Sequence, residues 1–162
     1  MDKLRNMTSI YLRRGDKLLL LYRIGSRVIG NSYTGTAGGH MEEAELNNPR
    51  ACVLRELQEE TGLSESDVEN LQFRYITLRL KNGEVRQNYY FFAELPDGAN
   101  LSLCSNEGTL KWVSLTDLFR YEMPATAKQM LEHWRTVGRG TNEIYGGVTN
   151  GKTAVFTEIT LF

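Results

Sequence analysis

The sequence predicts an α+β fold in which helices pack on a mixed β-sheet. Segments rich in aliphatic and aromatic residues alternate with two stretches of helical character, in the order strands, helix, strands, helix, strands. Turn sequences that contain glycine separate the strand segments. Because 162 residues suit one domain with its own core, we expect a single domain over residues 1–162.

The first part of the chain predicts a β-hairpin followed by a helix. Residues 8–12 and 17–24 are rich in apolar side chains and flank a turn at Gly15, and a short extended segment over residues 33–37 follows. Asn48 can cap a helix that begins at Pro49, where proline is tolerated, and Gly62 can end it.

The second part predicts two further hairpins and a second helix. The expected strands cover residues 72–80 and 85–95 around Asn82-Gly83, residues 110–114, and residues 143–148 and 152–161 around Thr149-Asn150-Gly151. Between them, Met130, Leu131 and Trp134 have helical spacing, which indicates a helix over residues 125–136.

Composition restricts the partners and the location of the protein. The net charge is −1, so no bulk attraction to a nucleic acid polymer or to an anionic membrane is expected. No apolar run approaches the ~20 residues of a membrane helix, and the N-terminus lacks the apolar stretch of a signal peptide. Two cysteines do not suggest a disulfide framework. We therefore expect a soluble, cytoplasmic protein.

Three glutamates of the first predicted helix suggest a metal site. Glu56, Glu59 and Glu60 stand at positions i, i+3 and i+4 and share one helical face. Exposed carboxylates that are so close repel one another, whereas a hard cation such as Mg²⁺ would bind them through oxygen. A solvated polar face is the alternative, because exposed glutamates are common. Upstream, Gly38-Gly39 would let the backbone approach a metal or a phosphate closely.

These residues resemble the Nudix box. That motif is a glycine, five residues, a glutamate, seven residues, then Arg-Glu-aliphatic-x-Glu-Glu-x-Gly-aliphatic. Gly39, Glu45 and residues 55–63 (RELQEETGL) follow it, except that nine residues separate Glu45 from Arg55. In the family a proline often begins the helix six positions before the arginine, as Pro49 does here, so the two extra residues are expected in the preceding loop.

The resemblance implies a Nudix-like α/β/α sandwich and a hydrolase that uses Mg²⁺ or Mn²⁺ to cleave a nucleoside diphosphate linked to another group. Water attacks one phosphorus and a carboxylate accepts its proton. The favoured substrate is a nucleoside triphosphate, an oxidised one included, cleaved to monophosphate and diphosphate. A nucleotide-sugar, ADP-ribose or dinucleotide pyrophosphatase, or a non-catalytic Nudix-like ligand sensor, is the alternative. The implied partner is a small-molecule nucleotide, and a homodimer is left open.

The resemblance also implies roles for individual residues. The catalytic residues it indicates are Glu56, Glu59 and Arg55, the arginine as an orienting partner. The metal ligands it indicates are the Gly38 carbonyl, Glu56, Glu59 and Glu60. A further ligand often comes from a later acidic residue, for which Glu107 is the first candidate and Glu94 the second; a solvated loop glutamate is the alternative. The residues expected to bind substrate are Gly39, Arg23 and Glu45. A surface arginine is the alternative for Arg23, which ends the second predicted strand, and Glu42 and Glu43 are nearby substitutes for Glu45.

Overall fold

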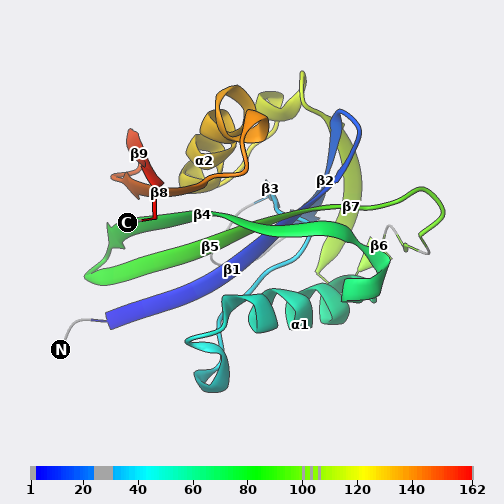
Figure 1. Cartoon of the computed structure of the whole chain (residues 1–162), viewed down its shortest axis with the longest axis horizontal. Helices are drawn as coiled ribbons and strands as arrows, with labels where there is room; N and C mark the ends of the chain where they lie inside the picture. The colour runs from blue at the N-terminus through cyan, green and yellow to red at the C-terminus, as the bar shows by residue number, and fades with distance from the viewer. Residues whose placement is uncertain (1–2, 24–30, 100, 103, 106, 162) are drawn as a thin grey trace.

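A mixed nine-stranded sheet forms the centre of the computed structural model, which describes residues 3–23, 31–99, 101, 102, 104, 105 and 107–161. The strand order is β6-β7-β2-β1-β5-β4-β8-β9, and β3 pairs with β2. Helix α1 lies against one face of the sheet and helix α2 against the other (Figure 1). The fold is therefore the expected α/β/α sandwich.

The helices and strands follow the predicted order, except that the short strand β6 was not predicted and β1 begins at Lys3 instead of Thr8. The strands are β1 (Lys3–Arg14), β2 (Lys17–Arg23), β3 (Ser32–Thr34), β4 (Glu69–Lys81), β5 (Glu84–Glu94), β6 (Cys104–Ser105), β7 (Gly108–Ser114), β8 (Ile144–Thr149) and β9 (Ala154–Ile159). The helices are α1 (Pro49–Thr61) and α2 (Ala125–Thr136), with 3₁₀ turns at Glu43–Glu45, Glu65–Asp67, Leu118–Arg120 and Gly138–Gly140. The predicted end of the second strand at Ile24 lies outside the described residues.

Local sequence signals account for the hairpins. Asn82 and Gly83 join β4 to β5 with backbone φ angles of 55° and 73°, as a type I′ turn requires. The pairs β1–β2 and β8–β9 are antiparallel hairpins too. By contrast, β1 pairs in parallel with β5 and β4 in parallel with β8, which makes the sheet mixed.

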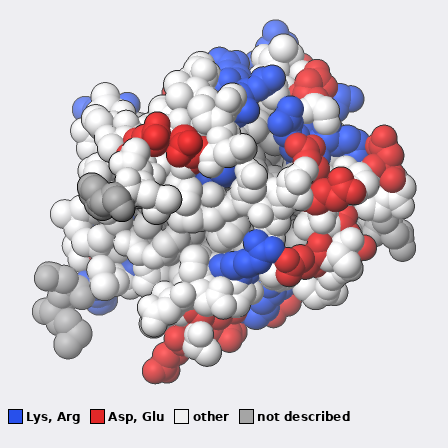
Figure 2. All heavy atoms as spheres, in the orientation of Figure 1, with Lys and Arg blue, Asp and Glu red and all other residues white. Residues whose placement is uncertain are grey.

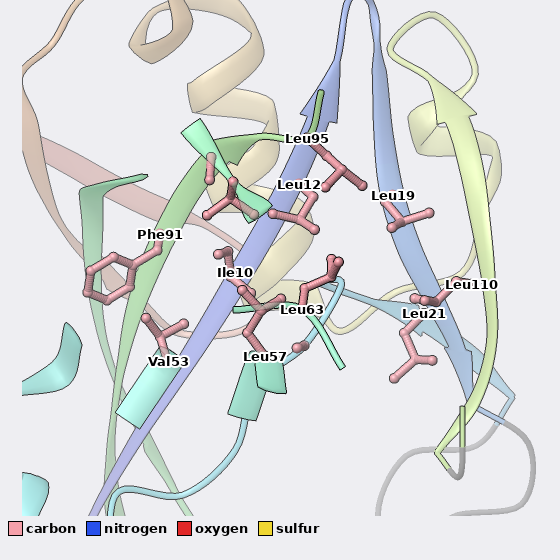
Figure 3. Close-up of a cluster of buried hydrophobic side chains, with 13 residues drawn as sticks. Ile10, Leu12, Leu19, Leu21, Val53, Leu57, Leu63, Phe91, Leu95 and Leu110 are labelled. Atoms are coloured by element: carbon pink, nitrogen blue, oxygen red, sulfur yellow. The ribbon is translucent and has the colours of Figure 1, made fainter. Parts of the chain in front are cut away.

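The sheet buries side chains on both of its faces. On the α1 side, Ile10 and Leu12 of β1 pack with Val53 and Leu57 of the helix and with Phe91 of β5 (Figure 3). The next residues along these strands point the other way, because side chains alternate across a strand.

The opposite core consists largely of aromatic side chains. Tyr11 and Tyr90 lie there with Met130 of α2, and Phe92 stacks on Trp134 with ring centroids 4.6 Å apart. The two cores hold one helix on each face, and α1 thereby comes to lie beside the loop that precedes it.

Helix α1 begins and ends where the sequence predicts. The Asn48 side chain accepts a hydrogen bond from the Ala51 N–H at 3.2 Å. Gly62 adopts a left-handed φ of 75°, and its N–H donates to the Gln58 carbonyl at 2.9 Å. These two caps fix the limits of the helix and so the phase of its glutamates.

The surface in Figure 2 carries basic and acidic side chains side by side, in keeping with the net charge of −1. Acidic side chains gather at the lower margin of this view, where Figure 1 places α1 and the turn before it. Within the described part of the chain, no helix is long and apolar enough to cross a membrane.

Replacing Asn48 by alanine is expected to lower the free energy of unfolding by about 1 kcal/mol, because the Ala51 N–H would lose its cap. Urea denaturation measures the change. Asn47→Ala, at an exposed neighbouring position, is the control and should leave the midpoint unchanged. Equal losses in both variants would contradict the capping role.

Candidate active site

The site is built where a loop passes between β1 and α1. Backbone hydrogen bonds of 2.9 Å, from Ile10 N–H to the Ala37 carbonyl and from Thr8 N–H to the Gly39 carbonyl, fix this loop to β1. A Cβ at Gly38 would lie 2.3 Å from the Thr8 carbonyl oxygen, and one at Gly39 would lie 2.4 Å from a carboxylate oxygen of Glu56. Only glycine allows this close approach of loop, strand and helix.

Glu60 points into the space beside this loop. Its Oε2 accepts a hydrogen bond from the Gly38 N–H at 3.1 Å, and its Oε1 lies 3.3 Å from Nη2 of Arg23. The side chain is only 10% exposed. Burial, with smaller contributions from nearby Glu56 and Glu107, raises the pKa of Glu60 to about 7, although Arg23 and the Gly38 N–H act in the opposite direction.

Arg23 links Glu60 to Glu107. Its Nη1 lies 3.5 Å from Oε2 of Glu107, so one guanidinium bridges two carboxylates that are 47 residues apart in the sequence. Glu107, the first candidate for a later acidic ligand, is thus brought to the helix carboxylates. Glu94, the second candidate, forms its ion pair with Arg13 instead, at 3.6 Å.

Arg55 orients the remaining acidic residues. Its Nη1 donates to Glu56 Oε1 at 2.8 Å and to Glu59 Oε2 at 3.2 Å. Its Nη2 also donates to the His40 carbonyl at 3.1 Å, which ties the helix to the glycine loop. Hydrogen bonding to Glu45, more than any other contact, raises the pKa of Arg55 above its already high ordinary value.

Glu45 is held by Arg55 in a two-point contact. Nε and Nη2 of Arg55 lie 2.8 and 3.0 Å from its two oxygens, and the Glu42 N–H donates to Oε2 at 2.9 Å. These hydrogen bonds, chiefly those from Arg55, lower the pKa of the buried Glu45 to about 2. In this arrangement Glu45 positions Arg55, and its contact with substrate stays a prediction.

The three helix glutamates share a face but differ in depth. The Glu56 side chain is 12% exposed and lies against Gly39, whereas the Glu59 side chain is 59% exposed. The difference follows from helix geometry, since Glu59 and Glu60 are successive residues about 100° apart around the axis. Glu56 and Glu60 therefore face the loop, and Glu59 lies at its rim.

The donor chemistry of this cluster fits a hard divalent cation. Glu56, Glu60 and Glu107 offer carboxylate oxygens, the ligands that Mg²⁺ and Mn²⁺ prefer, and Arg23 at present pairs with two of them, so a cation would have to displace it. In the part of the chain that the structure describes, no three acidic, histidine or cysteine side chains converge closely enough to hold a metal ion. Instead, Glu60 and Glu107 each form an ion pair with Arg23.

A cavity of about 360 Å³ adjoins the glycine loop. Gly38 and Arg23 line it, together with residues of β1, β4, β5 and the start of α2. Four buried side-chain polar atoms have no hydrogen-bond partner among the described residues, and three of them belong to lining residues: Arg23 Nε, Asn88 Oδ1 and Thr126 Oγ1. Sequence reasoning missed Asn88 and Thr126, because no motif marks them and only strand pairing and helix placement bring them here.

Most of the chain matches the model of one protein family. The model of the NUDIX domain matches residues 3–134, so the chain belongs to the NUDIX family. It is a nucleotide pyrophosphohydrolase, an enzyme that acts on acid anhydrides. Hydrolases of this family generally need a divalent metal ion and act on small-molecule nucleotides. A search of curated proteins found no match.

Solved structures share the fold. A mutator MutT protein from Bacillus halodurans superposes with a TM-score of 0.71 at 21% identity, over 94% of this chain and 97% of that one. The ORF135 protein of E. coli gives a TM-score of 0.65 at 22% identity, with 86% and 94% covered. An Ap4A hydrolase from C. elegans gives 0.61 at 18% identity, with 86% and 99% covered. The sandwich is thus common to all four chains.

Replacing Glu60 by glutamine is expected to raise the melting temperature at about pH 8 and to change it little at about pH 5. The pKa of Glu60 is about 7 in the folded protein against an ordinary 4.5, so the folded protein binds this proton more tightly than the unfolded chain does. The contribution of Glu60 to the free energy of unfolding is therefore fully present below its ordinary pKa of 4.5 and is lost as the pH rises through about 7. Glutamine does not ionise, so the variant does not lose this stability at high pH.

Thermal unfolding at both pH values measures the effect. Glu132→Gln is the control, because it removes an exposed helix carboxylate away from this site, and it should leave the melting temperature unchanged at both pH values. A lower melting temperature of Glu60→Gln at the higher pH would show that Arg23 and the Gly38 N–H outweigh the cost of burial.

Proposed function

We propose that the protein is a Mg²⁺- or Mn²⁺-dependent hydrolase of a nucleoside diphosphate linked to another group, with a nucleoside triphosphate as the favoured substrate, cleaved to monophosphate and diphosphate. One observation carries the proposal: Glu60 and Glu107 both pair with Arg23, Glu60 also accepts from the Gly38 N–H, and Glu56 lies against Gly39, next to the cavity. The cavity volume of about 360 Å³ is within the range of small-molecule sites.

Different residues of the site would bind the metal ion and accept the proton. A bound divalent cation would neutralise phosphate charge and lower the pKa of water. Glu60, Glu107 and the Gly38 carbonyl, with Glu56, would hold the cation. Glu56 or Glu59 accepts the proton of the attacking water, and Arg55 keeps both carboxylates in place through its Nη1.

The cavity would bind the rest of the substrate. When the Arg23 side chain leaves Glu60 and Glu107, it is placed to contact a phosphate oxygen. Arg23 lines the cavity, and its Nε has no hydrogen-bond partner among the described residues. Asn88 Oδ1 can accept a hydrogen bond from a nucleoside, and the Thr126 hydroxyl can donate or accept one. Buried polar atoms of this kind favour a ligand with matching polar groups.

Nucleoside triphosphates, a nucleotide-sugar, ADP-ribose and a dinucleoside polyphosphate form the test panel, assayed for phosphate-containing products with and without Mg²⁺ or Mn²⁺. We expect metal-dependent cleavage, fastest with a triphosphate. Faster cleavage of another compound would change the substrate class. Binding of a compound without cleavage would indicate a ligand sensor.

Glutamine replacements at the helix separate the roles on whichever substrate is cleaved. Loss of the general base, by Glu56→Gln or Glu59→Gln, should lower kcat by about 10²–10⁴-fold with little change in KM. Glu60→Gln should also raise the metal concentration required, because a ligand is lost. Glu132→Gln, on the exposed side of α2, is the control. Near-normal kcat in all three site variants would exclude catalysis by this helix.

A further inference from the structure

Three arginines lie side by side across the central strands. Arg86 of β5 is in register with Arg5 of β1 on one side and with Arg79 of β4 on the other. Residues in register project from the same face of a sheet, so the three side chains share a face. Like charges in directly opposed positions destabilise strand pairing, which makes this row costly in the absence of a balancing anion.

The neighbouring row on the same face is basic as well. Glu84 of β5 is in register with Lys3 and with Lys81. The two rows together hold five basic residues and one acidic residue, a formal charge of +4 on a chain whose net charge is −1. Glu84 pairs with Arg86, Nε to Oε2 at 2.7 Å, and more weakly with Arg5 at 3.8 Å. A single carboxylate therefore leaves most of this charge unbalanced.

Arg79 carries the least balanced charge of the row. Its side chain forms no hydrogen bond or ion pair with any residue that the structure describes. Burial, followed by the charge of Arg86, lowers the pKa of Arg79 from its ordinary value. A guanidinium that is partly buried and next to Arg86 is well suited to an incoming anion, because folding has already removed part of its hydration.

The arginine row and the glycine loop open into one cavity. Arg5, Arg79 and Arg86 line the cavity that Gly38 and Arg23 also line. A Cβ at Gly38 would lie 2.9 Å from the Cα of Ser9, which is four residues along β1 from Arg5. At about 3.3 Å per residue, Arg5 is therefore roughly 13 Å from Gly38. His40, two residues after Gly38, accepts a hydrogen bond from Nε of Arg5, so the far end of the same loop reaches the row.

An uncharged row separates the two ends of this cavity. Asn88 is in register with Met7 and with Thr77, and all three line the cavity floor. A ligand that reaches from the metal-bound diphosphate of the proposed function to the arginines would therefore be anionic at both ends and less charged between them.

We propose that Arg5, Arg79 and Arg86 form a second anion-binding site, which takes a phosphate group that the substrate carries away from the diphosphate to be cleaved. Guanidinium groups bind phosphate oxygens through paired hydrogen bonds, and three adjacent groups suit a dianion. The ligand class is a nucleoside diphosphate derivative with a further phosphate on its ribose or on the linked group. The proposal rests on the proposed function only for the position of the diphosphate.

A pair of dinucleotides that differ by one ribose phosphate, NADP⁺ and NAD⁺, tests the site. Calorimetric titration without divalent metal measures binding apart from turnover. The wild-type protein should bind NADP⁺ at least about tenfold more tightly than NAD⁺, because a charge-assisted hydrogen bond contributes about 1.5–3 kcal/mol. In Arg79→Gln this ratio should fall towards one, while the affinity for NAD⁺ stays within about twofold.

The control is Arg120→Gln, which removes the same charge from a side chain that is 80% exposed and does not line the cavity, and it should retain the ratio. The melting temperature of Arg79→Gln should equal or exceed that of the wild type, since repulsion within the row is relieved. Equal affinity of the wild type for both dinucleotides, absence of binding by either, or an equal loss for both in Arg79→Gln would overturn the proposal. If the wild-type protein prefers NADP⁺ to NAD⁺ as expected but cleaves no nucleotide, the proposed function is wrong and the anion-binding site still stands.

Discussion

The contact on which the site most depends is the hydrogen-bonded fork between Arg55 and Glu45. This bidentate pair joins the middle of α1 to the 3₁₀ turn before the helix. The same guanidinium also donates to Glu56, Glu59 and the His40 carbonyl. A single arginine thereby fixes the helix, its carboxylates and the glycine loop relative to one another. Because Arg55 stays charged at any physiological pH, this framework persists while Glu60 changes its protonation near neutrality.

Local signals predicted both helices and most of the strands, but not the first five residues of β1 or the short strand β6. The turn residues Asn82-Gly83, the cap Asn48 and the glycine at position 62 each have one strongly preferred backbone role, and the hairpin and helix limits follow from them. The parallel pairs β1–β5 and β4–β8 leave no such signal. They depend on burying both faces of the sheet under two helices, which is a property of the whole chain.

In the site too, features that depend on neighbouring residues could be predicted, whereas features that depend on distant segments could not. Residues 55–63 are contiguous, so their pattern could be recognised, and the close approach at Gly38 and Gly39 agrees with it. The bridge that Arg23 makes between Glu60 and Glu107 joins three distant segments of the chain. The sequence suggested these residues as separate candidates, but it could not predict that they contact one another. Spacing alone placed the helix glutamates on one face, but their unequal depth appears only when the loop is packed against the helix. Asn88, Thr126 and the arginine row depend on strand register and carry no local signal.

The tight turn at Asn82-Gly83 has a consequence far from its own position. It sets which side chains of β4 stand opposite those of β5, and so it aligns Arg79 with Arg86. One additional residue in the turn would slide β4 by a single step and rotate its side chains to the opposite face, so that Leu80 would replace Arg79 over the cavity. Relatives with a longer or shorter connection here could thus acquire different ligand preferences without any substitution in the strands themselves.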